Sequence, residues 1–153
     1  MDTTGFADEM ARVARRWRTH LNARFKSLGL TQSRWLALLE IKKAPDIMQS
    51  DLALALGIEG PTLVRILDGL EKQGLIERKA CARDRRAKRV HVTRAAEPML
   101  EQMRGIGIET RQAVLAGIPE ADILTTQRVM KQVADRLENL REDEAGAGGR
   151  HGG

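Results

Sequence analysis

A run of basic side chains between residues 83 and 89 is the strongest chemical signal in the sequence. Its cations are Arg83, Arg85, Arg86, Lys88 and Arg89. Guanidinium groups on a narrow polar loop suit phosphates and the minor groove of a duplex, where the negative potential attracts arginine. Asp84 is the one acid within the run. We expect it to pair with an arginine and fix the shape of the loop, the alternative being a turn-forming role.

The segment 60–73 presents a second basic surface if it folds as a helix. At about 3.6 residues per turn, its buried stripe consists of Leu63, Ile66, Leu67 and Leu70. The opposite face carries Thr62, Arg65, Gly69 and Lys72. A small, polar and basic helix face can lie in the major groove, where hydroxyl and guanidinium groups meet base edges. The alternative is an ordinary solvated helix face. The basic loop argues against this alternative, because it offers cations for a second groove of the same duplex.

The sequence contains no arrangement typical of an enzyme or a metal site. The histidines His20, His91 and His151 are far apart and join no carboxylate or cysteine cluster at ligand spacing. A nucleophile with a base and an oxyanion site is also missing, as is a Gly-rich phosphate loop after a strand. We therefore expect neither catalysis nor a bound cofactor.

The single cysteine, Cys81, lies at the base of the basic loop. It excludes an intrachain disulfide framework and, with no second cysteine nearby, a zinc site of the usual spacing. Neighbouring arginines favour the thiolate and hence oxidation. We favour a small strand residue instead, since the chain has no resolving cysteine and a disulfide between the distant basic loops of two subunits is hard to form.

Composition narrows the class of protein. The 153 residues carry a formal net charge of +5 and are 42% hydrophobic, which suits one compact unit with a polyanionic partner. No apolar run approaches the roughly 20 residues that span a bilayer, and the N-terminus lacks the apolar core of a signal peptide. We expect a cytoplasmic protein.

The two basic surfaces must be positioned by helices and a hairpin. Apolar spacing and capping residues predict helices over 6–28, 31–43, 50–56 and 60–73, and two long helices that begin near Thr93 and Pro119. The alternation of Val90 and Val92 with polar residues predicts a strand over 88–93, paired with one over 75–80. The predicted fold is mainly α with a small β-hairpin wing, a winged helix-turn-helix.

Four regions follow from this pattern. They are an N-terminal dimerisation helix (1–30), a winged helix-turn-helix region for DNA binding (31–93), C-terminal dimerisation helices (94–141) and a disordered tail (142–153) rich in Gly and Ala. The long helices at both ends have more apolar surface than a small monomer can cover. We therefore expect a homodimer.

The stretch GIEGPTLVRILDGLEKQGLIERKACARDRRAKRVHVT resembles the recognition helix and wing of the MarR family of transcription regulators, particularly its SlyA branch. The likeness extends to LGLTQSRWLALLEI, to Ala96-Glu97-Pro98 and to the C-terminal helices. It implies that Arg86 enters the minor groove with Asp84 as its buttress, and that Thr62 and Arg65 face the major groove. The expected DNA contacts are Gln49, Ser50, Pro61, Thr62, Arg65, Lys72, Arg83, Asp84, Arg85, Arg86 and Lys88.

Members of this family often bind small aromatic carboxylates between the dimerisation helices and the DNA-binding lobe, so the resemblance implies such a site here. Its candidate residues are Arg15, Trp17, Ser33, Trp35 and Arg65. Core packing is the alternative for the two tryptophans. Arg65 is implicated in both sites, so a bound acid would compete with DNA for it.

Together these expectations describe a homodimeric DNA-binding transcription regulator that reads a pseudo-palindromic operator. Helix 60–73 would occupy the major groove and wing 81–89 the minor groove, and the protein would be a repressor, or an anti-silencing activator, released by a salicylate-like acid. One alternative is a winged-helix module that binds an acidic protein instead of DNA. A membrane-surface protein is another, but the four aromatic residues fall mainly on buried stripes.

Overall fold

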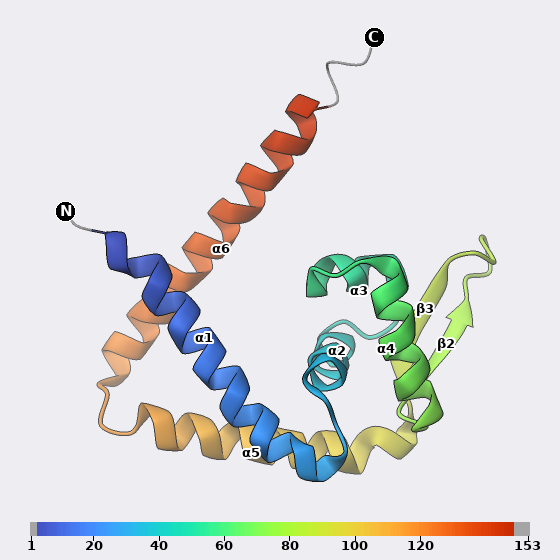
Figure 1. The fold of residues 1–153 in the computed structure, drawn as a ribbon, viewed down its shortest axis with the longest axis horizontal. Coiled ribbons are helices and arrows are strands. Elements are labelled where there is room, and N and C mark those ends of the chain that lie inside the picture. Colours follow the sequence, from blue (N-terminus) through green and yellow to red (C-terminus); the bar gives the residue numbers. More distant parts are fainter. Residues whose placement is uncertain (1–2, 149–153) are drawn as a thin grey trace. The chain divides into compact units, whose positions relative to one another are not determined.

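A computed structural model describes the backbone of residues 3–148 and the side chains of residues 3–145 (Figure 1). Its elements in chain order are α1 (Thr4–Phe25), η1 (Lys26–Leu28), α2 (Gln32–Lys43), β1 (Ile47–Met48), α3 (Gln49–Leu56), α4 (Gly60–Lys72), β2 (Ile76–Ala80), β3 (Lys88–Val92), η2 (Arg94–Ala96), α5 (Glu97–Leu115) and α6 (Glu120–Gly148). This mainly helical chain with a small antiparallel sheet confirms the predicted fold class. It divides into two compact units, the first ending at Thr110 and the second beginning at Arg111.

A glycine and a proline define the turn between α3 and α4. Gly57 has a φ of 65°, and its amide donates to the carbonyl of Leu54 at 3.1 Å. Glycine is favoured there because a Cβ makes this left-handed angle costly. Pro61 stands in the first turn of α4, where the missing amide donor is not needed. The predicted pair of short helices around a tight turn is confirmed.

The wing, formed by β2, β3 and the connecting residues 81–87, belongs to a three-stranded antiparallel sheet in the order β1-β3-β2. Ile76 in β2 lies opposite Val92 in β3. On the other side of β3, Ile47 lies opposite Val90, which is fully buried. The sequence predicts the hairpin but not β1, because two residues are too short to show an alternation.

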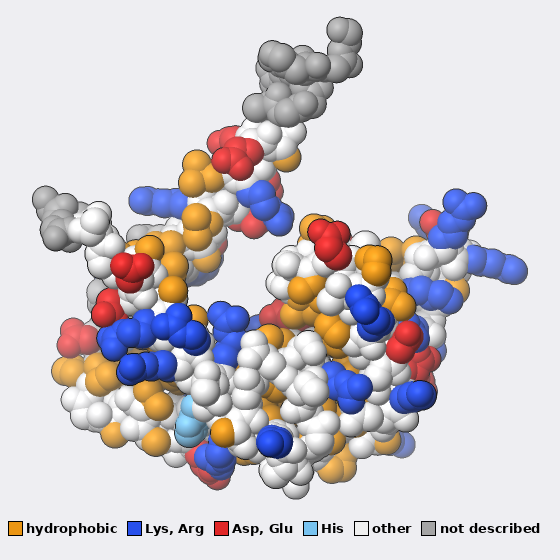
Figure 2. Space-filling model, in the orientation of Figure 1, with side chains coloured by type: hydrophobic (Ala, Val, Ile, Leu, Met, Phe, Trp, Pro, Cys, Tyr) orange, Lys and Arg blue, Asp and Glu red, His pale blue; other side chains and the backbone are white. Residues whose placement is uncertain are grey.

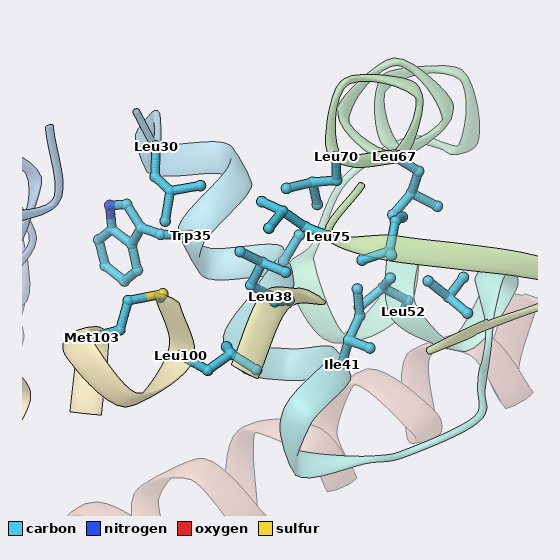
Figure 3. Packing of buried hydrophobic residues seen from close by; sticks show 14 of the residues in the cluster. Leu30, Trp35, Leu38, Ile41, Leu52, Leu67, Leu70, Leu75, Leu100 and Met103 are labelled. Carbon is cyan, nitrogen blue, oxygen red and sulfur yellow. The ribbon is translucent and has the colours of Figure 1, made fainter. Parts of the chain in front are cut away.

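Buried side chains from α1 to α5 and the sheet form the core of the first unit (Figure 3). Trp35 is 2% exposed and meets the ring of Phe25 edge-on, with centroids 5.2 Å apart. Its indole Nε1 donates to Asn22 Oδ1 at 2.7 Å. A buried ring whose N–H is satisfied is a packing residue. This corrects the expectation that Trp35 offers a face to a ligand.

Helix α6 continues to Gly148, into the segment 142–153 for which composition predicts disorder. Glutamate, arginine and alanine are good helix formers, and Arg141 pairs with Glu138, three residues earlier, at 2.5 Å. Helix propensity rather than burial accounts for the helix over 142–145, since Glu142, Glu144 and Ala145 are helix formers and the side chains there are exposed. Residues 149–153 of the expected tail lie outside the described part of the chain.

Candidate nucleic-acid interface

Helix α4 packs on the core with one face and leaves the opposite face exposed. Leu63, Leu67 and Leu70 are completely buried, and Ile66 is half-buried. The exposed residues of the opposite face include Pro61, Thr62, Arg65 and Lys72. The leucine spacing therefore fixes the rotation of α4 about its axis as the sequence predicts.

The wing carries exposed cations beside this helix. Arg83, Arg85, Arg86 and Lys88 are exposed, and Lys and Arg side chains gather on the hairpin at the right of the view in Figure 2. None of the four forms an ion pair with a described residue. Cations that are not neutralised within the fold remain available to an external polyanion.

Asp84 shapes the tip of the wing through the backbone. Its Oδ1 accepts a hydrogen bond from the amide of Arg86 at 2.9 Å, and its carbonyl accepts one from the amide of Ala87 at 3.1 Å. Cys81 and Ala87 close the loop with an amide-to-carbonyl bond of 2.9 Å. The expected pairing of Asp84 with an arginine side chain is therefore corrected. Asp84 is a turn former, because its carboxylate mimics a backbone acceptor.

The starts of α3 and α4 and the base of the wing surround a cavity of about 270 Å³. Gln49, Ser50, Gly60, Arg86 and Lys88 are among the residues that line it. Neither helix start has a side-chain cap, so first-turn amides and the positive ends of two helix dipoles are left for an anion. The structure thus brings Gln49 and Ser50 together with two of the expected wing residues.

Arg89 and His91 connect the sheet to the turn after α2. Arg89 Nη1 donates to the carbonyl of Asp46 at 2.9 Å, and Asp46 has a φ of 62°. His91 lies between two carboxylates, with Nε2 3.1 Å from Glu77 Oε2 and Nδ1 3.5 Å from Asp46 Oδ1. The sequence groups Arg89 with the other wing cations, whereas the structure uses it to hold a backbone turn. No local pattern in the sequence connects Arg89 with Asp46.

An ion-pair network that the sequence analysis misses joins β2 to α4. Arg78 Nε donates to Glu71 Oε2 at 2.7 Å, and Arg78 Nη2 donates to Asp68 Oδ1 at 2.6 Å. Burial lowers the pKa of Arg78, but hydrogen bonds and charge attraction from both acids outweigh it, so the pKa lies above its usual value. Arg78 is neutralised within the fold.

A second cavity, of about 470 Å³, opens at the start of α2. Its lining consists of Thr31, Gln32, Ser33, Leu36, Leu56, Ile58 and Ile66. Of the residues expected to bind an effector, Ser33 lines this cavity and Arg15, Trp17 and Arg65 do not. Arg15 and Arg65 are exposed, and Trp17 is half-buried against the core. The expected effector residues are thus not gathered around this cavity.

Among residues 3–148, no group of three or more His, Cys, Asp and Glu side chains is arranged to hold a metal ion. No helix in that range is long and apolar enough to cross a membrane. Cys81 is half-buried, and its thiol donates to Met48 Sδ at 3.6 Å.

Comparison with known proteins finds a family model and several similar solved structures. The sequence model of the MarR family matches residues 28–87. The solved structure of the transcriptional regulator PA3341 is 42% identical, with a TM-score of 0.80 over 88% of this chain and 98% of that one. That of the transcriptional regulator SlyA is 26% identical, with a TM-score of 0.70 over 94% and 96%. FabT of Streptococcus pneumoniae, solved in complex with DNA, shares the fold at 19% identity, with a TM-score of 0.75 over 91% and 99%.

The hydrogen bond from the Arg86 amide to Asp84 gives a test of the wing. Replacing Asp84→Ala removes the acceptor, and amide exchange of Arg86, measured by NMR, should become about three- to tenfold faster. Asp84→Asn keeps a side-chain oxygen and should leave the exchange rate close to wild type. Equal acceleration in both variants would show that the charge of Asp84, rather than its acceptor, orders the loop.

Proposed function

Because this chain belongs to the MarR family of DNA-binding transcription regulators, we propose that it reads a pseudo-palindromic operator as a homodimer. In this proposal α4 lies in the major groove with Thr62 and Arg65 toward the bases, and the wing places Arg86 in the adjacent minor groove. Promoter occlusion makes the protein a repressor. The likeness to SlyA at 26% identity supports an anti-silencing activator as the alternative.

The observation that carries the proposal is the set of exposed, unpaired cations on α4 and the wing. Exposed cations that form no ion pair with a described residue include Arg65 and Lys72 on α4 and Arg83, Arg85, Arg86 and Lys88 on the wing. Elsewhere in the first unit, Arg12 pairs with Glu9 at 2.6 Å and Arg24 pairs with Glu109 at 2.7 Å. Cations without a described ion-pair partner also occur on α1, at Arg15, Arg16 and Arg18, but those of α4 and the wing lie on the elements that a duplex would contact. Phosphate neutralisation by such cations gives affinity that falls as salt rises.

The proposed function can be tested by measuring the affinity for duplex DNA at several salt concentrations. The logarithm of the association constant should fall linearly with the logarithm of salt concentration, with a slope of roughly −0.9 for each phosphate neutralised. Arg65→Ala should weaken operator binding by about 1–3 kcal/mol and relax preference at one base pair. Fluorescence anisotropy on an operator found by footprinting measures both. If the protein showed no salt-dependent binding to duplex DNA, the result would instead favour a module that binds another protein.

Large apolar side chains that remain exposed on α1 and on α6 support the homodimer. Phe6 and Val13 on α1 are 42% and 54% exposed. On α6, Met130, Leu137 and Leu140 are exposed and Val133 is half-buried, at spacings of three and four residues. Such a stripe is normally covered by a partner helix. We propose a second copy of this chain as that partner.

Leu137→Glu should therefore shift the protein from dimer to monomer, because dimerisation would have to bury an unpaired charge. Sedimentation velocity at matched concentrations measures the change. Gln132→Glu adds the same charge at an exposed position of α6 outside the apolar stripe and serves as the control, with the dimer retained. A Leu137→Glu variant that sediments as a dimer would exclude this stripe from the interface.

We further propose that a small aromatic carboxylate of the salicylate type is the effector. The cavity at the start of α2 supports this, since its leucine and isoleucine side chains suit a ring and the Ser33 hydroxyl suits a carboxylate. Arg65 is exposed and adjoins Ile66, which lines the cavity. An acid that recruits the Arg65 guanidinium competes with DNA for it. Arg15 and Trp17 are candidates for further contacts to the acid.

Salicylate should accordingly weaken operator binding by the wild type, and weaken it much less in Arg65→Ala. The measurement is the fold change in Kd for each protein at the same salt concentration. Benzyl alcohol, which has the ring but no carboxylate, is the control and should leave both Kd values unchanged. Equal weakening of the two proteins by salicylate would contradict a role of Arg65 in the response.

A further inference from the structure

Arg34, in the first turns of α2, lies against the outer face of α4 at Gly69. A Cβ built on Gly69 would be 2.8 Å from Arg34 Cζ and 2.9 Å from Arg34 Nε. Real Cβ atoms essentially never come this close to another heavy atom. The guanidinium therefore occupies the space that a side chain at position 69 would fill. Because these atoms are the far end of a flexible side chain, a side chain at position 69 would displace the guanidinium rather than disrupt the helix.

The guanidinium of Arg34 is held in this place by a neighbour at the end of α4. Arg34 Nη1 donates to Gln73 Oε1 at 3.1 Å. Gln73 Nε2 in turn donates to the carbonyl of Gly29 at 3.4 Å. Gln73 thus connects Arg34 with the turn that precedes α2. A half-buried arginine with a fixed head loses less conformational freedom on binding than a free surface arginine.

The charge of Arg34 is not neutralised by a described residue, in contrast to that of Arg78. Both arginines contribute to a depression of about 620 Å³ along α4, whose lining also includes Asp68, Glu71 and Lys72. Arg78 pairs with Asp68 and Glu71, which are the two acids of this depression. Arg34 has only the neutral Gln73 as a side-chain partner. The positive charges of Arg34 and Lys72 therefore remain available.

We propose that Arg34 is a DNA-contacting residue, carried by α2 to the reading face of α4 at Gly69, where it binds a phosphate of the operator. This inference rests on the proposed function of α4 as the major-groove helix. Position 69 lies to the side of the outer face centred on Arg65 and Lys72. The sides of a helix in the major groove face the phosphates that border the groove, whereas its centre faces the bases.

Arg34→Ala should weaken operator binding about tenfold and reduce the steepness of the log-log salt dependence by about one unit. Gly69→Ala should weaken binding in the same direction, because the new methyl group displaces the guanidinium. It should not lower the thermal unfolding midpoint, because alanine favours a helix more than glycine does. Combining Arg34→Ala with Gly69→Arg returns a cation to the same place and should restore most of the affinity and the salt dependence.

The matched control is Arg94→Ala, which removes the same charge from an exposed residue at the start of η2, and it should bind like the wild type. Wild-type protein without salt-dependent duplex binding would contradict the proposed function itself. Normal binding by the wild type together with an unchanged Kd and slope for Arg34→Ala would overturn only the role of Arg34. Loss of affinity with an unchanged slope, not restored by Gly69→Arg, would make Arg34 a packing residue and would overturn the proposal as well.

Discussion

The burial of Leu63, Leu67 and Leu70 on one side of α4 determines what the other side of the helix presents. All three are completely buried, and exposing any of them would cost about 1.5–3 kcal/mol. A rotation of α4 about its axis would expose part of this stripe, so the helix has one stable orientation. The outward positions of Thr62 and Arg65 follow from it. So does the place of Gly69, which lets an arginine from another helix reach the same surface.

Elements marked by periodic apolar residues or by turn-forming residues could be predicted from the sequence. The helices, the rotation of α4, the hairpin and the turn at Gly57 are of this kind, because apolar spacing and backbone angles are local properties. Contacts between distant residues could not. The bond from Arg89 to the carbonyl of Asp46 and the packing of Arg34 on Gly69 leave no pattern in the sequence, since each depends on how separate elements meet.

Two interpretations of side chains changed for a related reason. The sequence shows that Trp35 lies on an apolar stripe but not what the stripe faces, and Asn22 and Phe25 complete its burial. Asp84 stands among arginines, which suggests an ion pair. The carboxylate instead accepts a hydrogen bond from the backbone amide of Arg86, two residues further along the chain. The guanidinium groups of Arg83, Arg85 and Arg86 are thus left without an ion-pair partner among the described residues.

The short strand β1 has a consequence for the kind of DNA that the protein selects. β1 pairs with β3 of the wing and runs directly into α3, with Met48 ending the strand and Gln49 beginning the helix. Because β1 is hydrogen-bonded to β3 and leads into α3 without a linker, the hairpin and the helix-turn-helix cannot tilt independently. In the proposed DNA complex, α4 and the wing would therefore meet the major and minor grooves at a fixed angle. Base steps that twist easily or narrow the minor groove would then be favoured even where no side chain touches them.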